Sequence, residues 1–474
     1  MPENTILGNV TSDVISDQQF EYMRLISQIM QDRKRGDKPV AYIRTYGCQQ
    51  NVADSERIKG MLEIAGFEFS ETVDDADFIL FNTCAIREHA EDRAFGNVGA
   101  LKSLKRKHPQ IVIALCGCMM EQEHIANKMY KSFPFVSLVF GTHSLHRFPQ
   151  LLYHTLADGK RVYERDNDDK KVYEGIPVKR DGTFKGWLSI MYGCNNFCTY
   201  CIVPYVRGRE KSRRPKEILQ EIERLADDGV VEIMLLGQNV NSYGKNLEEP
   251  ITFAQLLQEV ERIEGLERIR FMTSHPKDLS DELIEVMKHS KKICRHLHLP
   301  LQSGSTKILT AMNRRYTKEQ YLELAEKIRK EIPDMAITTD IIVGFPGETK
   351  EDVDETIDVI RRVKYDNAFT FIYSKRTGTP AAAMEQVPEE LVKEQFDRVL
   401  KTVQETAREQ VSRYQGQICD VLVEEINEND SSLVTGRMSN NTLVHFPGDA
   451  SLVGKLVNVS LDECHGFYYM GHMV

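Results

Sequence analysis

The sequence predicts an α/β protein of three domains. Its 474 residues are about three times the usual length of one domain. Strand-like runs alternate with helical stretches along most of the chain, and this pattern is typical of parallel sheets covered by helices. The last sixty or so residues change to short β-type runs separated by Gly and Asn, as in small antiparallel barrels. We therefore expect an N-terminal doubly wound parallel-sheet domain, a central partial (βα)6 TIM-like barrel and a C-terminal small antiparallel β-barrel. The expected boundaries are an N-terminal extension at 1–38, the sheet domain at 39–157, a linker at 158–185, the partial barrel at 186–408 and the small barrel at 409–474.

Composition indicates a folded chain in the cytoplasm. Charged residues make up 28% and hydrophobic residues 41% of the chain, which excludes wholly disordered and fibrous classes. No apolar run reaches the roughly 20 residues of a membrane helix, and the N-terminus lacks the features of a signal peptide. Ten cysteines are too sparse for a disulfide scaffold and favour metal binding or catalysis. The net charge of −10 argues weakly against nucleic-acid binding. Such binding depends on local basic patches, so it stays possible.

The first domain is expected to follow a polar segment with one helix at 18–32. Its strands are predicted at 40–46, 78–82, 111–116 and 136–140, with helices at 52–65, 86–104 and 121–131. Three loops at the carboxyl ends of these strands carry Cys48, Cys84 and Cys118. In open parallel sheets this edge is where binding sites form.

The second domain contains six strand-like runs after a charged connector. They lie at 187–192, 232–236, 270–273, 296–300, 337–343 and 368–373. Six βα units are too few to close an eight-stranded barrel, so an open barrel is expected, with its site at the carboxyl ends of the strands. A helix is predicted at 389–414, and short strands follow at 418–424, 432–438, 442–446 and 456–460.

A group of three cysteines follows the first strand of the expected barrel. Cys194, Cys198 and Cys201 form a C-x3-C-x2-C pattern. Zinc commonly takes four protein ligands, whereas three thiolates on a four-iron cluster leave one iron open for substrate or cofactor. The alternative is a set of structural cysteines or a zinc site with a distant fourth ligand. Tyr200 could lie against a flat ligand such as adenine, or simply pack in the loop.

The second group is Cys48, Cys84 and Cys118. Their spacings are too long to indicate a shared site, so that prediction depends only on where each cysteine lies in the expected fold. Each residue follows a strand of one sheet by two residues, so three thiolates at that edge could hold a second cluster. The alternative is three buried thiols. Cys116 competes with Cys118, but it still belongs to the apolar run and is expected to point into the sheet's packing.

Several long motifs resemble one family. The segment CNNFCTYC with IVPYVRGREKSRRP resembles radical S-adenosylmethionine enzymes. The segments TYGCQQN, NTCAIREHAEDRAFGNVG, LLGQNVNSYG, LHLPLQSGS and TTDIIVGFPGET resemble the methylthiotransferases among them. The resemblance runs from about residue 39 to the C-terminus. GCQQN and KRTGTP depart from the commonest forms, GCQMN and PRPGTP, without touching an expected ligand.

The resemblance implies a methylthiotransferase that acts on N6-dimethylallyladenosine at position 37 of tRNA, next to the anticodon. It implies two 4Fe–4S clusters, each with three Cys ligands, bound by the two cysteine groups. S-adenosylmethionine would be both radical source and methyl donor. It further implies a C-terminal RNA-binding domain of the TRAM type. Expected partners are a tRNA anticodon stem-loop, an electron donor such as flavodoxin or ferredoxin, and a sulfur source, with no membrane and a monomeric chain.

Other residues are expected to hold cofactor or RNA. Candidates for S-adenosylmethionine at the strand exits are Tyr200, Gly237, Gln238, Asn239, Gln302, Ser303 and Gly344. The alternative for the exit residues is ordinary turn chemistry. The basic run after the radical-type cysteines is expected to meet RNA phosphates, with Arg207, Arg209, Arg213 and Arg214 as candidates.

Two rival functions remain at this point. One keeps the chemistry but changes the substrate to threonylcarbamoyladenosine in tRNA or a ribosomal-protein aspartate. The other is a non-catalytic iron–sulfur protein that binds RNA or carries electrons. The count of three thiolates argues against the second rival, because electron carriers commonly use four protein ligands.

Overall fold

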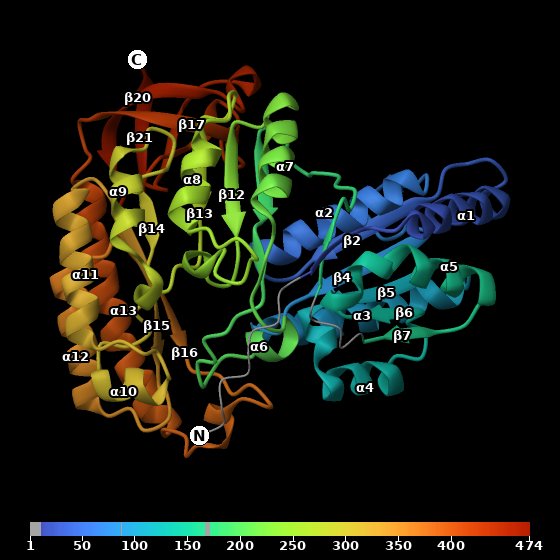
Figure 1. The fold of residues 1–474 in the computed structure, drawn as a ribbon, viewed down its shortest axis with the longest axis horizontal. Coiled ribbons are helices and arrows are strands. Elements are labelled where there is room, and N and C mark those ends of the chain that lie inside the picture. The colour runs from blue at the N-terminus through green and yellow to red at the C-terminus, as the bar shows by residue number, and fades with distance from the viewer. Residues whose placement is uncertain (1–10, 87, 166–170) are drawn as a thin grey trace.

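The computed structural model describes residues 11–86, 88–165 and 171–474. Figure 1 shows an N-terminal α/β domain beside a half-open barrel, with a small β-barrel at the end of the chain. The three expected architectures are therefore present. No helix in the described part of the chain is long and apolar enough to cross a membrane.

The N-terminal domain is a six-stranded parallel sheet. The strand order is β3 (Glu68–Phe69), β2 (Val40–Thr45), β4 (Phe78–Thr83), β5 (Val112–Gly117), β6 (Leu138–Phe140) and β7 (Val162–Glu164). One face packs against α1 (Asp17–Lys34), α2 (Gln49–Ile64) and α5 (Phe148–Asp158). The other packs against α3 (Glu88–Lys107) and α4 (Glu123–Ser132). Since helices cover both faces, β4 and β5 are buried along their whole length, and β4 is apolar up to Asn82 while β5 is apolar throughout.

Two segments outside the expected domain belong to it. The predicted helix near residue 18 exists as α1, and its Met23, Ile26 and Met30 are buried in the sheet's core. The short β1 (Thr11–Val14) pairs in parallel with β8 (Lys171–Glu174). The expected linker also contains β7, which completes the sheet. These strands have three or four residues, too few for an alternating pattern to stand out.

The central domain is an open barrel of six parallel strands. They are β9 (Lys185–Ser189), β12 (Glu232–Leu236), β13 (Arg268–Phe271), β14 (His296–His298), β15 (Ala336–Val343) and β16 (Asn367–Ile372). They form two three-stranded sheets, which a parallel bridge between Ile269 and Ile293 brings together. The strands pack outward on α7 (Pro215–Asp227), α8 (Phe253–Glu261), α9 (Asp281–His289), α11 (Lys318–Glu331), α12 (Lys350–Val363) and α13 (Glu389–Ser412). A separate antiparallel pair, β10 (Met191–Tyr192) and β11 (Lys211–Ser212), brackets the cysteine loop.

The C-terminal domain is a closed barrel of five strands. Its order is β17 (Ile418–Ile426), β18 (Leu433–Met438), β19 (Leu443–Pro447), β21 (Tyr468–Met473) and β20 (Leu456–Cys464). The sequence reading missed β21, and the expectation of a wholly antiparallel barrel is wrong at one place, because β19 and β21 pair in parallel. Arg268 donates to the carbonyl of Arg437, and Arg270 donates to that of Met438. This barrel is therefore attached at the amino ends of the partial barrel's strands, at the top of Figure 1 and away from α6 (Val203–Val206), the helix that follows the cysteine loop.

Candidate active site

Three thiols meet at the carboxyl edge of the N-terminal sheet. Cys48, Cys84 and Cys118 follow β2, β4 and β5, and the Cys84 thiol lies close enough to both other thiols to be coupled to their ionisation. The amide of Ala85 donates to the Cys118 sulfur at 3.1 Å. Cys116 faces the other way and lies in the core of the sheet. The structure thus brings together the three predicted residues and separates Cys118 from its competitor.

Two glycines let the three loops come this close. Gly47 precedes Cys48 with a φ of 145°, and a Cβ on it would lie 2.6 Å from the Cβ of Cys84. Gly117 precedes Cys118 with a φ of 101°, and a Cβ there would lie 2.2 Å from the carbonyl oxygen of Thr83. Because any side chain at either position would collide with a neighbouring loop, glycine is needed for the thiols to converge.

The electrostatics of these thiols depends on their mutual contacts. The neighbouring Cys84 thiol and burial raise the pKa of Cys48, and the contact with Cys84 lowers the pKa of Cys118. No trio of His, Cys, Asp or Glu in the described ranges is arranged to hold a single metal ion. The donor set is all sulfur, with Cys84 and Cys118 buried and Cys48 partly buried, which suits an iron–sulfur cluster by its chemistry.

The second thiol set lies in the loop between β10 and α6 (Val203–Val206). Asn313 donates to the carbonyl oxygens of Asn196 and Phe197 at 3.1 and 3.0 Å, which holds the loop in place. Arg314 Nη1 lies 3.5 Å from the Cys198 sulfur. Burial raises the pKa of Cys194 and that of Cys201 to about 12. A positive centre such as a cluster, together with Arg314, would stabilise the thiolate forms.

The two thiol sets are neighbours. Ile202, directly after Cys201, packs with Val206 against Cys84 and Cys118 in one apolar cluster. Helix α6 therefore connects the loop that carries Cys194, Cys198 and Cys201 to the edge of the N-terminal sheet. From the sequence we expected each set at the carboxyl ends of the strands of its own domain. The fold places these two strand ends against each other.

Polar atoms without partners mark the strand exits of the barrel. The side-chain oxygens Gln238 Oε1, Asn239 Oδ1 and Gln302 Oε1 are buried and have no hydrogen-bond partner among the described residues. Buried polar atoms are nearly always satisfied, so three predicted residues present what a polar ligand needs. Gly237 instead gives room to Met191, and the Gly344 amide donates to Glu348 at 2.5 Å.

The structure adds three residues to this set. Asn241 Oδ1, Ser274 Oγ and His275 Nε2 are also buried without a partner in the described part of the chain. Burial, and then the charge of Arg314, lower the pKa of His275 to about 2, so its ring is neutral. Ser274 and His275 belong to the segment TSHPKD, which directly follows β13. This position at the end of a barrel strand is the sequence feature that could have predicted them as site residues.

The remaining predicted residues pack locally. Tyr200 packs against an apolar cluster that contains Met312 and Phe345. The Ser303 hydroxyl accepts a hydrogen bond from the amide of Ser305 at 3.3 Å. These contacts support the loop and turn roles that the sequence left open for both residues.

Comparisons with known proteins identify the family of this chain. Residues 188–360 match the Radical SAM superfamily, residues 40–141 match "Uncharacterized protein family UPF0004", and residues 412–474 match the TRAM domain. A protein of Lachnoclostridium phytofermentans is 55% identical over 92% of this chain and 96% of its own length. One of Thermoanaerobacter sp. is 50% identical over 98% and 99%. Both bear the name tRNA-2-methylthio-N(6)-dimethylallyladenosine synthase.

This chain belongs to the tRNA-2-methylthio-N(6)-dimethylallyladenosine synthase family. Membership of the radical SAM superfamily carries S-adenosylmethionine and a 4Fe–4S cluster as cofactors. Among solved structures, the radical S-adenosylmethionine methyltransferase TsrM from Kitasatospora setae aligns with a TM-score of 0.53 at 15% identity, covering 73% of this chain and 77% of its own. The cobalamin-dependent radical enzyme OxsB aligns with a TM-score of 0.51 at 12% identity, covering 78% and 56%. At these identities the likeness concerns the fold alone.

The structure exposes only part of the basic run that was expected to contact RNA. Arg207 is buried against Asp54 at 3.1 Å, and Arg213 is buried between Glu174 and Glu221 at 2.6 and 2.7 Å. The expectation that these two side chains meet RNA phosphates is therefore corrected, because their charges are already paired inside the protein. Arg209 and Arg214 are exposed, and Arg209 lies 4.2 Å from the centre of the Phe197 ring.

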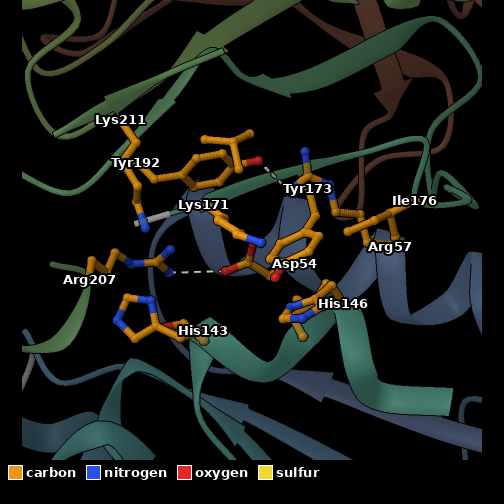
Figure 2. A pocket seen from close by; sticks show the side chains of 13 residues that line it. Asp54, Arg57, His143, His146, Lys171, Tyr173, Ile176, Tyr192, Arg207 and Lys211 are labelled. Atoms are coloured by element: carbon orange, nitrogen blue, oxygen red, sulfur yellow. Dashed lines mark hydrogen bonds and ion pairs between the residues drawn. The ribbon is translucent and has the colours of Figure 1, made fainter. Parts of the chain in front are cut away.

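A small pocket lies where the N-terminal domain meets the barrel. Its volume is about 70 Å³, and Figure 2 shows Arg207 and Asp54 meeting at its edge. Arg57 donates to the Tyr192 hydroxyl at 2.5 Å across the same junction. Polar and charged side chains thus carry much of the contact between the two domains in this family member.

Proposed function

We propose that this chain converts N6-dimethylallyladenosine at position 37 of tRNA, next to the anticodon, to its 2-methylthio derivative. The support is the name shared by relatives of half-identical sequence over nearly their full length. It is joined by one structural observation, the packing of Ile202 and Val206 against Cys84 and Cys118. The reaction needs a radical site and a sulfur site close to one carbon atom, and two adjacent thiol sets meet that need.

The target C2–H bond of adenine is not acidic enough for a side-chain base, so the difficult chemistry belongs to cofactors. When bound, S-adenosylmethionine and two 4Fe–4S clusters would together remove the hydrogen from C2 and provide the sulfur atom and the methyl group.

The chain's own residues hold and shield these groups in the proposal. Cys194, Cys198 and Cys201 hold one cluster and Cys48, Cys84 and Cys118 the other, each set leaving one iron without a protein ligand. Arg314 stabilises negative charge on Cys198 from 3.5 Å. The apolar contacts of α6 exclude water between the two sets.

The strand exits would bind S-adenosylmethionine in the proposal. Gln238, Asn239 and Gln302 offer unpartnered oxygens, which accept hydrogen bonds from an ammonium group and ribose hydroxyls. The substrate is an anticodon stem-loop, whose unstacked bases can enter a site, and exposed Arg209 and Arg214 contact its phosphates. A one-electron donor such as flavodoxin or ferredoxin and a sulfur source complete the reaction of a monomeric chain.

The experiment is mass spectrometry of tRNA nucleosides from a strain lacking this gene. We expect N6-dimethylallyladenosine to accumulate and its 2-methylthio derivative to disappear. The intact chain should restore the product, and a chain with Cys194, Cys198 and Cys201 all changed to Ala should not. Persistence of the 2-methylthio nucleoside in the deletion strain would refute the proposal.

A further inference from the structure

The last strand of the partial barrel presents two phenylalanines to its inner side. On β16, Ala368 packs into the core formed with the outer helices, whereas Phe369 and Phe371 are each 47% exposed. Successive side chains of a strand point to opposite faces, so the two rings share the face turned away from the helices. Large exposed apolar side chains that lie together commonly mark a binding surface.

The neighbouring strands confirm which face this is. The parallel register pairs Phe369 with Asp340 and Phe371 with Ile342 on β15. The Asp340 carboxylate lies 3.4 Å from His298 Nε2 on β14, and the His298 ring lies 6.1 Å from that of Phe369. These side chains form one continuous inner surface. Strand β16 ends its sheet, and within the described residues no strand pairs with its outer edge.

The segment that follows β16 reaches both thiol sets. Arg376 donates to the carbonyl of Ile86 at 2.7 Å, two residues after Cys84. The amide of Ala381 donates to the carbonyl of Thr199 at 3.0 Å, two residues before Cys201. The carboxyl end of β16 therefore leads to the junction of the two proposed cluster sites, and a base reacting there would lie against the inner surface of this strand.

We propose that Phe369 and Phe371 bind the apolar N6 substituent of the substrate adenosine and thereby determine specificity; the proposal rests on the methylthiotransferase function above. A dimethylallyl group offers no hydrogen bond, so burial against other apolar groups is what can recognise it. Asp340, 30% exposed on the same face, disfavours a substituent that carries a carboxylate, such as threonylcarbamoyl. Two phenyl rings beside one carboxylate thus select a neutral alkenyl group and reject an anionic one.

The test compares the binding of two anticodon stem-loops that differ only in the dimethylallyl group. Fluorescence anisotropy gives the dissociation constant of each RNA for the cluster-loaded protein without S-adenosylmethionine, so binding is read without turnover. The native chain should prefer the prenylated RNA by about tenfold or more, since single apolar groups in a pocket are worth that much. Phe369→Ala with Phe371→Ala should remove most of this preference and leave the affinity for unmodified RNA within about twofold.

Two further variants sharpen the result. Phe369→Leu with Phe371→Leu keeps apolar side chains and should retain part of the preference. Phe20→Ala removes a partly exposed ring from α1, 39% exposed, and should leave the affinity for both RNAs unchanged. A full preference in the double Ala variant would overturn the inference, as would an equal loss of affinity for both RNAs. If the native chain binds both RNAs alike and still forms the 2-methylthio product, the inference fails while the proposed function stands.

Discussion

Arg207 and Asp54 join the two domains that carry the thiols. Their side chains lie 3.1 Å apart and are 5% and 7% exposed. Arg207 directly follows α6, the helix after Cys201, and Asp54 lies in the first turns of α2 after Cys48. The pair therefore couples the position of one thiol set to that of the other.

Removing one partner of this pair should destabilise the chain. Asp54→Ala leaves the Arg207 charge buried without its carboxylate, and breaking such a pair costs about 3–5 kcal/mol. Denaturant unfolding of the cluster-free protein measures the loss. Glu68→Ala breaks the exposed Lys38–Glu68 pair and should cost less than about 1 kcal/mol. Equal stability of the two variants would contradict the coupling role.

Each thiol set should account for its own iron. The triple Ala variant of Cys48, Cys84 and Cys118 should lose roughly four irons and four sulfides per chain. The triple Ala variant at Cys194, Cys198 and Cys201 should lose the same amount. Metal and sulfide analysis of anaerobically prepared protein measures both. Cys116→Ala, which changes a thiol buried in the sheet core, should keep the full content; a loss there would mean that Cys116 is the ligand.

Gln302 should contribute to S-adenosylmethionine binding. Its φ of 72° disfavours most residues, so Gln302→Asn is the suitable change, because Asn tolerates this conformation. Moving the unpartnered oxygen should weaken binding by about tenfold, equivalent to about 1.4 kcal/mol. Calorimetric titration of the cluster-loaded protein measures it, with an iron count to show an intact cluster. Unchanged affinity would remove Gln302 from the site.

Arg209 and Arg213 should behave differently. Arg209→Ala should weaken tRNA binding and reduce the slope of log affinity against log salt by about 0.7, the value for one phosphate contact on a single strand. Arg213→Ala should instead lower stability, since it leaves the buried Glu174 without its partner. Filter binding across a salt series and denaturant unfolding separate the two effects.

Arg262→Ala, an exposed change on α8's carboxyl side, is the matched control for Arg209. It should leave the salt slope unaltered. A slope for Arg209→Ala that coincides with this control across the salt series would exclude the phosphate contact.

Glu348 should make stability depend on pH. Burial raises its pKa to about 7 from an ordinary value of 4.5. The folded chain therefore binds more protons than the unfolded chain between these pH values, so this group's contribution falls as pH rises from about 4.5 to 7. Glu348→Gln should remove up to roughly 3 kcal/mol of that dependence. Unfolding curves at pH 5 and pH 8 measure it, and an unchanged difference between the two would contradict the shift.

Much of the architecture follows from local pattern. The apolar strands of both parallel domains and the C-x3-C-x2-C loop are visible because their periods and spacings lie within a few residues. Cys118 could be preferred over Cys116 for the same reason, since only Cys116 continues the apolar run. Strands of three residues such as β7, and the parallel pairing of β21, depend on partners far along the chain and were missed.

The sequence by itself determined the three architectures and both sets of candidate ligands, because strand periodicity, the position of a cysteine just after a strand and the spacing within one loop are local properties. Only the tertiary structure decided which charges are buried and which apolar side chains are exposed. Arg207 and Arg213 form a basic run in the sequence, yet their carboxylate partners Asp54 and Glu174 come from another part of the chain and remove them from the surface. In the sequence, Phe369 and Phe371 look like residues of any buried strand. They are exposed because the barrel is open beside β16. Burial depends on what long-range packing brings against a side chain, and no local pattern contains that information.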